Sequence, residues 1–344
     1  MKKNEDSFEN LSEDEMVEQA EKLLEERGKE ALEMARNEVL QEKVESKEVQ
    51  EALRYFMTEY WHDVTRPALM SLVCEAVGGN SDKVTPVAVS MILISGAIDI
   101  HDDIIDESKT KGSRPTVLGK FGRDIALLVG DALLFKGFTL LYKAIEKGLS
   151  TEKASLILNI IKETFFKLGD AEACELRFRG RQDINPDEYI HVVKKKAADV
   201  EAYTRISTIL GNGSPGEVEI FGKFGRLLGM IIILRDDLID MIDYEEIVHR
   251  INKEHLPLPI LYALQNPRLN STLKSIILKK DITESDAETI LDITEKAEGF
   301  KRFRIIMEEI EKEMSQLLTI FKNKKNKLAL LVKSILLPLD ELEV

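Results

Sequence analysis

Two short segments of the chain each carry three aspartates at the same spacing. They are Asp102, Asp103 and Asp106 in the first segment, and Asp236, Asp237 and Asp240 in the second. In a helix with 3.6 residues per turn, the first and last aspartate of each segment share a face. Mg²⁺ prefers oxygen ligands and often shares carboxylates with substrate phosphates. The spacing therefore predicts two carboxylate faces that hold Mg²⁺ against a phosphate-bearing substrate.

Both segments lie within apolar runs, residues 87–105 for the first and 227–241 for the second. A carboxylate buried among apolar side chains is costly unless a cation compensates its charge. Pairing with arginine or lysine is the alternative to a metal, but few basic residues lie near either segment in the sequence. Two such segments on apolar helices therefore favour a metal site.

Helical periodicity runs along most of the chain, whereas sustained strand alternation is almost absent. Glycine- or proline-containing breaks near residues 78–80, 211–216 and 257–259 separate the apolar segments. We predict an all-α fold, a single-domain many-helix bundle. Residues 1–48, rich in Glu and Lys, are expected to form an acidic N-terminal helical extension, and residues 49–344 the main helical domain.

The overall charge and the apolar runs limit the possible partners. A net charge of −14 disfavours a nucleic-acid partner, because it repels phosphates. The polar first residues do not resemble a secretory signal, and no apolar run reaches the roughly 20 residues of a membrane span. Cys74 and Cys174 show no disulfide or metal-ligand spacing. We therefore expect a cytoplasmic protein without a membrane span.

The order of these segments resembles the trans-isoprenyl diphosphate synthases, the polyprenyl synthetase family. The matching stretches are HDDIIDESKTKGSRPTV (101–117) and RDDLIDM (235–241) for the two aspartate-rich motifs, KKAADVEA (195–202) for the Lys-Thr motif, and NKEHLPLPILYAL (252–264) for the lysine loop. The resemblance implies an isoprenoid synthase-like bundle in which the two aspartate helices face a deep central cavity.

The resemblance also implies a reaction and the residues that carry it. Mg²⁺ and lysines would neutralise the diphosphate that leaves an allylic prenyl diphosphate, and isopentenyl diphosphate would attack the resulting cation. The implied metal ligands are all six aspartates, and the implied catalytic residues are Asp102, Asp103, Asp106, Lys195 and Asp236. Candidates for clamping the diphosphate are Lys111, Lys195 and Lys253.

The acceptor half of the resemblance is incomplete. The family uses a lysine, an arginine, a histidine and a second arginine for isopentenyl diphosphate; here these positions hold Asp63, Arg66, Ser95 and Gly112. An aspartate facing a diphosphate would repel it. Arg66 and Ser95 stay candidate substrate-binding residues, but the identity of the acceptor is open.

Asp99 lies about one helical turn before Asp102, at a position where the family usually has an apolar residue. One interpretation is a buried polar side chain paired with a lysine or a backbone amide. The other is a substrate-binding residue that lines the cavity and stabilises a cation or takes its proton.

Three functions follow from these observations. The first is a prenyltransferase that condenses an allylic diphosphate with isopentenyl diphosphate to make a longer polyprenyl diphosphate. The second is a terpene synthase-like lyase, or prenyl transfer to a different acceptor. The third is a non-catalytic regulatory subunit of a heteromeric synthase. We expect a homodimer for the first function, with a heteromer as the alternative.

Overall fold

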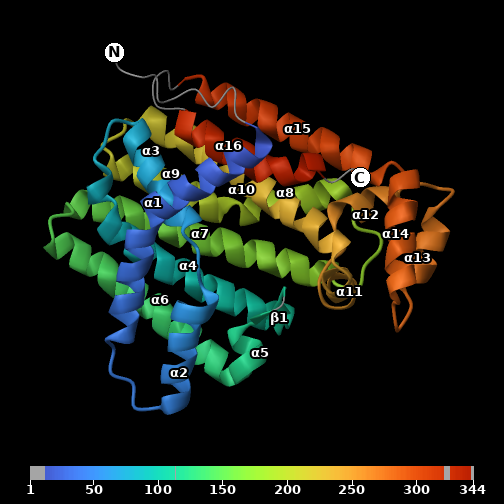
Figure 1. The fold of residues 1–344 in the computed structure, drawn as a ribbon, viewed down its shortest axis with the longest axis horizontal. Coiled ribbons are helices and arrows are strands. Elements are labelled where there is room, and N and C mark those ends of the chain that lie inside the picture. Colours follow the sequence, from blue (N-terminus) through green and yellow to red (C-terminus); the bar gives the residue numbers. More distant parts are fainter. Residues whose placement is uncertain (1–11, 113, 321–325, 342–344) are drawn as a thin grey trace. The chain divides into compact units, whose positions relative to one another are not determined.

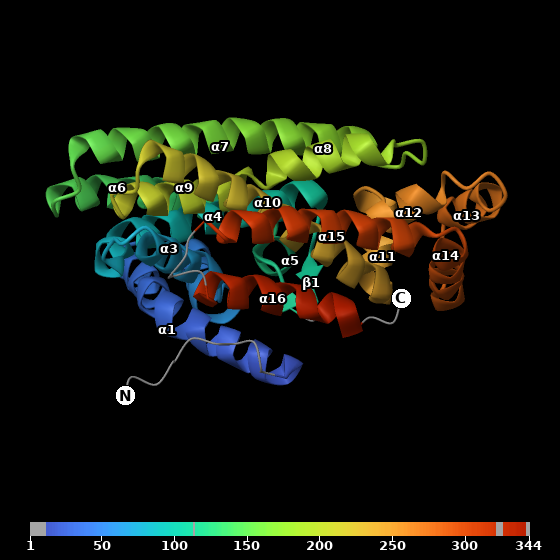
Figure 2. The same cartoon turned by 90° about the horizontal axis from the view of Figure 1, so that it is seen from above.

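The computed structural model describes residues 12–112, 114–320 and 326–341 (Figures 1 and 2). Most of these residues are helical, and the strands among them are β1 (Thr110–Lys111) and β2 (Arg114–Pro115), which pair antiparallel. The prediction of an all-α fold is therefore confirmed.

The described chain divides into two compact units. Unit 1 comprises Met1–Ile160, Tyr203–Phe221 and Asn326–Leu328, and unit 2 comprises Ile161–Ala202, Gly222–Lys325 and Ala329–Val344. Four helices contribute residues to both units: α7 (Thr151–Phe178), α9 (Ala198–Leu210), α10 (Pro215–Ile242) and α16 (Asn326–Glu341). The division therefore runs through helices rather than linkers. The domain boundary predicted at residue 48 stays a prediction.

Unit 1 is built around α4, the helix that ends in the first aspartate segment. Helix α4 spans Thr85–Asp106. The other elements of this unit are α1 (Glu13–Leu40), α2 (Lys47–Tyr55), the π-helix η2 (Phe56–Tyr60), α3 (Thr65–Ala76), the 3₁₀ turn η3 (Ser81–Lys83), α5 (Val117–Phe121) and α6 (Arg123–Glu146). Helix α6 packs along α4. The two backbones approach closely at Gly137, where a Cβ atom would lie 2.6 Å from Ile94 Cγ1.

Helix α6 is long and apolar enough to cross a membrane by length and hydropathy alone. A core helix of a globular protein passes the same test, and several α6 side chains are buried in unit 1, among them Val129, Leu133 and Leu141. Its packing on α4 accounts for these residues. Helix α6 is thus an exception to the sequence prediction that no apolar segment reaches the length of a membrane span.

Helix α1 has a capped N-terminus, and its middle is attached to α3. A capping box joins Ser12 and Glu15 at its N-terminus. Farther along, Arg27 pairs with Glu75 of α3 at 2.5 Å, and a Cβ atom on Gly28 would meet the Val64 carbonyl oxygen. Buried Ala31, together with other small apolar side chains of this helix, faces the rest of unit 1.

Unit 2 carries the second aspartate segment on α10. Its remaining helices are α8 (Pro186–Lys196), α11 (Tyr244–Lys253), α12 (Leu258–Ala263), α13 (Asn270–Ile277), α14 (Glu284–Lys296) and α15 (Gly299–Leu318). Figure 2 shows α8 beside the C-terminal part of α7. The Asn185 side chain caps α8, and that of Asp243 caps α11, so local sequence fixes where both helices begin.

Candidate functional site

The first aspartate segment ends α4 and is followed by the β1–β2 hairpin. The hairpin brings Lys111 back over the helix end, where its Nζ lies 2.8 Å from Asp103 Oδ1 and 3.4 Å from Asp99 Oδ1. Gly112 has a φ of +57°, a left-handed conformation that suits glycine. Glycine therefore suits this turn, at the position where the family resemblance expects arginine. Asp99 is half-buried and pairs with this lysine; whether it also binds substrate stays a prediction.

Asp103 is the deepest carboxylate of the first segment. Its side chain is 1% exposed, and its Oδ2 accepts no hydrogen bond from the described residues. Burial raises the pKa of Asp103 to about 7, although the charge of Lys111 opposes this. Burial disfavours the charged form of Lys111, but Asp99, Asp103 and Asp102 raise its pKa well above the usual value. Lys111 is thus a fixed cation beside a carboxylate that has a spare oxygen.

These features fit a divalent ion that is held partly by its substrate. Among the described residues, no three His, Cys, Asp or Glu side chains lie close enough to hold a metal ion by themselves. Mg²⁺ is commonly bound through one or two carboxylates, with substrate phosphates and waters as further ligands. Asp102 and Asp106 are half-buried on either side of Asp103 in the chain. The orphaned Asp103 oxygen is consistent with such a site.

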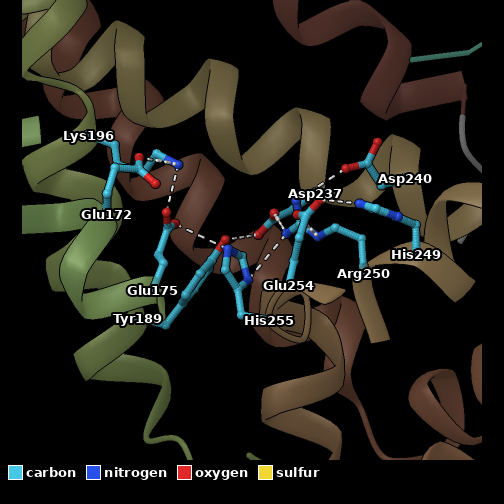
Figure 3. Close-up of polar contacts among 10 residues, drawn as sticks. All are labelled: Glu172, Glu175, Tyr189, Lys196, Asp237, Asp240, His249, Arg250, Glu254 and His255. Carbon is cyan, nitrogen blue, oxygen red and sulfur yellow. Dashed lines mark hydrogen bonds and ion pairs between the residues drawn. The ribbon is translucent and has the colours of Figure 1, made fainter. Parts of the chain in front are cut away.

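The second aspartate segment is enclosed by side chains from other helices of unit 2 (Figure 3). Arg250 of α11 forms a close ion pair with Asp237 Oδ1 and lies 3.3 Å from Asp240 Oδ2. The Tyr189 hydroxyl of α8 donates to Asp237 Oδ2 at 2.5 Å. Both oxygens of Asp237 are therefore occupied. The expectation of few basic partners is wrong for this segment, because the arginine comes from the next helix.

A second row of residues supports this enclosure. His255 accepts at Nδ1 from Arg250, 3.5 Å away, and its Nε2 lies 3.1 Å from Glu175. Its ring lies 4.9 Å from the ring of Tyr189, measured between centroids. The network continues to Lys196, whose Nζ lies 2.7 Å from Glu175 Oε2. These contacts link α7, α8, α10 and α11 into one polar network within unit 2 (Figure 3).

The charges in this network shift several pKa values. Burial opposes ionisation of Glu175, but Lys196 and His255 bring its pKa down to about 2. Burial also opposes ionisation of Glu254, yet His249 and Arg250 bring its pKa down to about 2. Burial raises the pKa of Asp240 to about 7 despite Arg250. The network thus holds Glu175 and Glu254 ionised and lets Asp240 take up a proton near neutral pH.

The remaining predicted residues of unit 2 lie outside this enclosure. Asp236 is 54% exposed and pairs with the neighbouring Arg235 at 3.0 Å. Lys195 forms an ion pair with Asp170 of α7, and Lys253 is exposed at the last turn of α11. Their roles as diphosphate clamps stay predictions.

The predicted acceptor residues lie in unit 1 and have partners of their own. Arg66 Nη1 pairs with Asp63 Oδ2 at 2.7 Å, while Asp63 Oδ1 accepts from the backbone N–H of Thr65 at 2.9 Å. Asp63 thus serves the start of α3 and neutralises Arg66. Ser95 is buried, and its hydroxyl lies 2.7 Å from that of Tyr203. Whether Arg66 and Ser95 bind substrate stays a prediction.

The polyprenyl synthetase family model matches residues 46–294 of this chain. The chain belongs to the polyprenyl synthetase family. The matched range contains both aspartate segments, the Lys111 hairpin and Arg250. Membership confirms the resemblance that the sequence motifs indicate.

Individual relatives agree with this assignment. A short chain isoprenyl diphosphate synthase of Methanothermobacter thermautotrophicus is 32% identical over 53% of this chain and 55% of its own length. An Arabidopsis thaliana protein named heterodimeric geranylgeranyl pyrophosphate synthase large subunit 1, chloroplastic, is 30% identical over 56% of this chain and 54% of its own length. The matches thus span about half the length of these relatives.

The fold extends beyond these sequence matches. The solved structure of geranylgeranyl pyrophosphate synthetase from Pyrococcus horikoshii superposes with a TM-score of 0.79 at 24% identity, covering 92% of this chain and 98% of that one. This likeness concerns the fold, and it confirms the isoprenoid synthase-like helical bundle that the sequence predicts.

Sequence reasoning missed the enclosure of the second segment. Arg250 and Tyr189 have no motif spacing to Asp237 in the sequence, and neither do Glu175 of α7 and His255 of the loop between α11 and α12. One signal in the sequence could have indicated the network. His255, Glu175 and Arg250 are polar residues that stand beside apolar residues, and those apolar residues are buried in the fold. Only the packing of α8 and α11 on α10 shows that they meet.

Proposed function

We propose that this chain is a Mg²⁺-dependent prenyltransferase that ionises an allylic prenyl diphosphate and joins it to isopentenyl diphosphate. The observation that carries the proposal is the buried Asp103 carboxylate beside Lys111, in a member of the polyprenyl synthetase family. The names of the relatives, which are isoprenyl and geranylgeranyl diphosphate synthases, agree with chain elongation.

The chain's own residues have distinct roles in this proposal. Asp102, Asp103 and Asp106 of unit 1 would hold Mg²⁺, and for unit 2 we propose the exposed Asp236 as a metal ligand in its own right. Bound Mg²⁺ would stabilise the negative charge that develops on the leaving diphosphate. Lys111 stays protonated and donates hydrogen bonds to diphosphate oxygens, while Asp99 orients it from 3.4 Å. In unit 2, Lys195 and Lys253 are proposed as further diphosphate-binding cations.

The test is an incubation of the purified chain with Mg²⁺ and farnesyl or geranylgeranyl diphosphate, with and without isopentenyl diphosphate. We expect longer prenyl diphosphates only when isopentenyl diphosphate is present. No product and no released diphosphate in either reaction, with a correctly folded protein, would contradict a catalytic role for the isolated chain.

A second function is favoured by the Asp63–Arg66 ion pair. This pair occupies the arginine that the family resemblance assigns to isopentenyl diphosphate, and it adds a negative charge. The chain would then act as a lyase or transfer the prenyl group to another acceptor. Diphosphate release with a hydrocarbon or alcohol product in the absence of isopentenyl diphosphate would support this function over elongation.

Association with a second chain is part of the proposal. Large apolar side chains are exposed along α6 and the start of α7 in unit 1: Leu127, Leu128, Phe135, Phe138, Tyr142, Leu156 and Leu158. Apolar patches of this kind mark protein interaction surfaces, so we propose a homodimer. The cytoplasmic location stays a separate proposal from the sequence. A regulatory subunit of a heteromer is the alternative, since one relative is named as a heterodimer subunit. Light scattering of the chain alone, and pull-down of a homologous partner, distinguish the two.

A further inference from the structure

Arg250 is the cation that pairs with two carboxylates of the second aspartate segment. Its guanidinium pairs with Asp237 Oδ1 and lies 3.3 Å from Asp240 Oδ2 (Figure 3). The side chain is 12% exposed, and that of Asp237 is 2% exposed. A guanidinium keeps its proton under all physiological conditions and fits carboxylates through a planar fork of donors. The second aspartate segment is therefore paired with a permanent cation from α11.

The contacts leave little of Asp237 for another ligand. Arg250 holds one carboxylate oxygen, and the Tyr189 hydroxyl donates to the other at 2.5 Å. A bound Mg²⁺ would need a carboxylate oxygen at about 2.0–2.1 Å in a nearly octahedral shell. Each Asp237 oxygen already has a donor, and the guanidinium beside Oδ1 would repel a divalent cation placed there, so an ion at Asp237 would have to displace Arg250.

Displacement is opposed by the residues behind the arginine. Glu254 Oε2 lies 3.5 Å from Arg250 Nε, and His249 Nε2 holds the same carboxylate at 3.1 Å. His255 lies against both Arg250 and the ring of Tyr189. Moving Arg250 would leave the buried Asp237 carboxylate without its ion-pair partner, which is strongly destabilising.

Asp103 of the first segment has a different environment among the described residues. Asp103 has one ion-pair partner, Lys111, and an Oδ2 atom without a hydrogen bond from the described residues. Asp236, the exposed member of the second segment, pairs with Arg235 at the surface. The buried carboxylate best suited to a divalent ion is thus Asp103 of the first segment, and within the second segment it is the exposed Asp236.

We propose that Arg250 is a built-in counter-ion that takes the place of a divalent ion at Asp237 and Asp240, so that metal binding depends on the first segment. The metal part of this inference rests on the proposed function. The enclosure of Asp237 by Arg250 and Tyr189 does not depend on it. Arg250 acts here as a positioning residue for α10 rather than as a group that touches substrate.

The experiment counts bound Mn²⁺ by electron paramagnetic resonance on the full chain, with inorganic pyrophosphate as a non-reacting anion. The variants are Asp103→Asn for the first segment and Asp240→Asn for the second. We expect Asp103→Asn to weaken Mn²⁺ binding by at least about tenfold, and Asp240→Asn by less than about twofold. Equal weakening by the two variants would overturn the proposal.

A second measurement tests Arg250 itself through the melting temperature. In Arg250→Gln, the melting temperature should fall, and Mn²⁺ should raise it by more than it raises that of the wild type, because the uncovered carboxylates gain an ion in addition to that of the first segment. In the double variant Arg250→Gln/Asp237→Asn, Mn²⁺ should raise the melting temperature no more than in the wild type. An Mn²⁺-dependent rise in Arg250→Gln that equals that of the wild type contradicts the proposal. If Arg250→Gln does not fold, the Mn²⁺ count on Asp103→Asn and Asp240→Asn still decides.

The outcomes separate this inference from the proposed function. A chain that passes both measurements but forms no prenyl product retains the arginine counter-ion and loses the prenyltransferase proposal. A chain that elongates prenyl diphosphates and loses Mn²⁺ on Asp240→Asn keeps the function and loses the counter-ion.

Discussion

The end of α4 and the middle of α10 carry the same aspartate spacing in different surroundings. At α4, a hairpin supplies one lysine, and Asp103 keeps an oxygen without a hydrogen bond from the described residues. At α10, Arg250 and Tyr189 occupy both oxygens of Asp237, and a second row of charged residues holds them. The two segments thus have the same carboxylates at the same spacing, but a ligand can reach these carboxylates to different degrees. The reason is that their partners come from other parts of the chain.

This difference changes what each region is suited to do. A carboxylate with a spare oxygen beside a protonated lysine is suited to bind a metal and a diphosphate together. A carboxylate that is fully hydrogen-bonded to neighbouring helices is suited to hold those helices in place. We therefore expect substitutions at α4 to affect chemistry first, and substitutions around α10 to affect stability first.

The largest effect is expected from Asp103→Asn, which keeps the side-chain shape and removes the charge. The rate of diphosphate release from farnesyl diphosphate should fall about 10²–10³-fold, since the variant loses electrostatic stabilisation of the transition state. Single-turnover product analysis measures it. Asp82→Asn, at an exposed position of unit 1, is the control and should keep the wild-type rate. A fully active Asp103→Asn would remove the first segment from the chemistry.

The next effect concerns stability in acid, which should arise from the network around α10. The pKa of Glu175 is lowered from 4.5 to about 2 in the folded chain, so its stabilisation is complete above pH 4.5 and is lost as the pH falls toward 2. The loss should approach about 3 kcal/mol, given about 1.4 kcal/mol per unit.

Urea unfolding at steps across this pH range measures the loss. The Glu175→Gln variant should be less stable at pH 6 and should lose less stability in acid than the wild type. Glu188→Gln, an exposed position on α8 of the same unit, should follow the wild-type curve. Parallel curves for Glu175→Gln and the wild type would show that Glu175 has no special role in acid.

A smaller effect is expected from Tyr189→Phe. This variant removes the donor to Asp237 Oδ2 and leaves a buried acceptor unsatisfied. The free energy of unfolding at neutral pH should fall by about 1–3 kcal/mol. Chemical denaturation measures it, with Tyr142→Phe at a 63% exposed residue as the control. An unchanged stability would mean that Arg250 alone satisfies Asp237.

The smallest effect is expected from Asp63→Asn in unit 1. An asparagine oxygen can still accept from the Thr65 N–H, so the start of α3 is kept while the charge on Arg66 is released. If Arg66 binds isopentenyl diphosphate, the KM for that substrate should fall by up to about fivefold, which corresponds to about 1 kcal/mol, the upper end for a partly exposed ion pair. Steady-state kinetics at low ionic strength gives the answer. An unchanged KM would place Arg66 outside the acceptor site.

The sequence by itself determined the helical class, the family and the position of both aspartate segments. Helical periodicity and the equal spacing of Asp102–Asp106 and Asp236–Asp240 are local properties, so they are readable without tertiary contacts. The starts of several helices can also be read from the local sequence, such as that of α8 from its Asn185 cap. The substitutions at Asp63, Ser95 and Gly112 likewise show in the sequence alone.

Only the tertiary structure decided how the carboxylates are neutralised. Lys111 reaches Asp103 because the Gly112 turn folds the hairpin back onto α4, and Arg250 reaches Asp237 because α11 packs beside α10. The strength of a charge interaction depends on separation in space and on burial, and neither is encoded by spacing along the chain. For that reason two segments with one spacing pattern have different chemical environments.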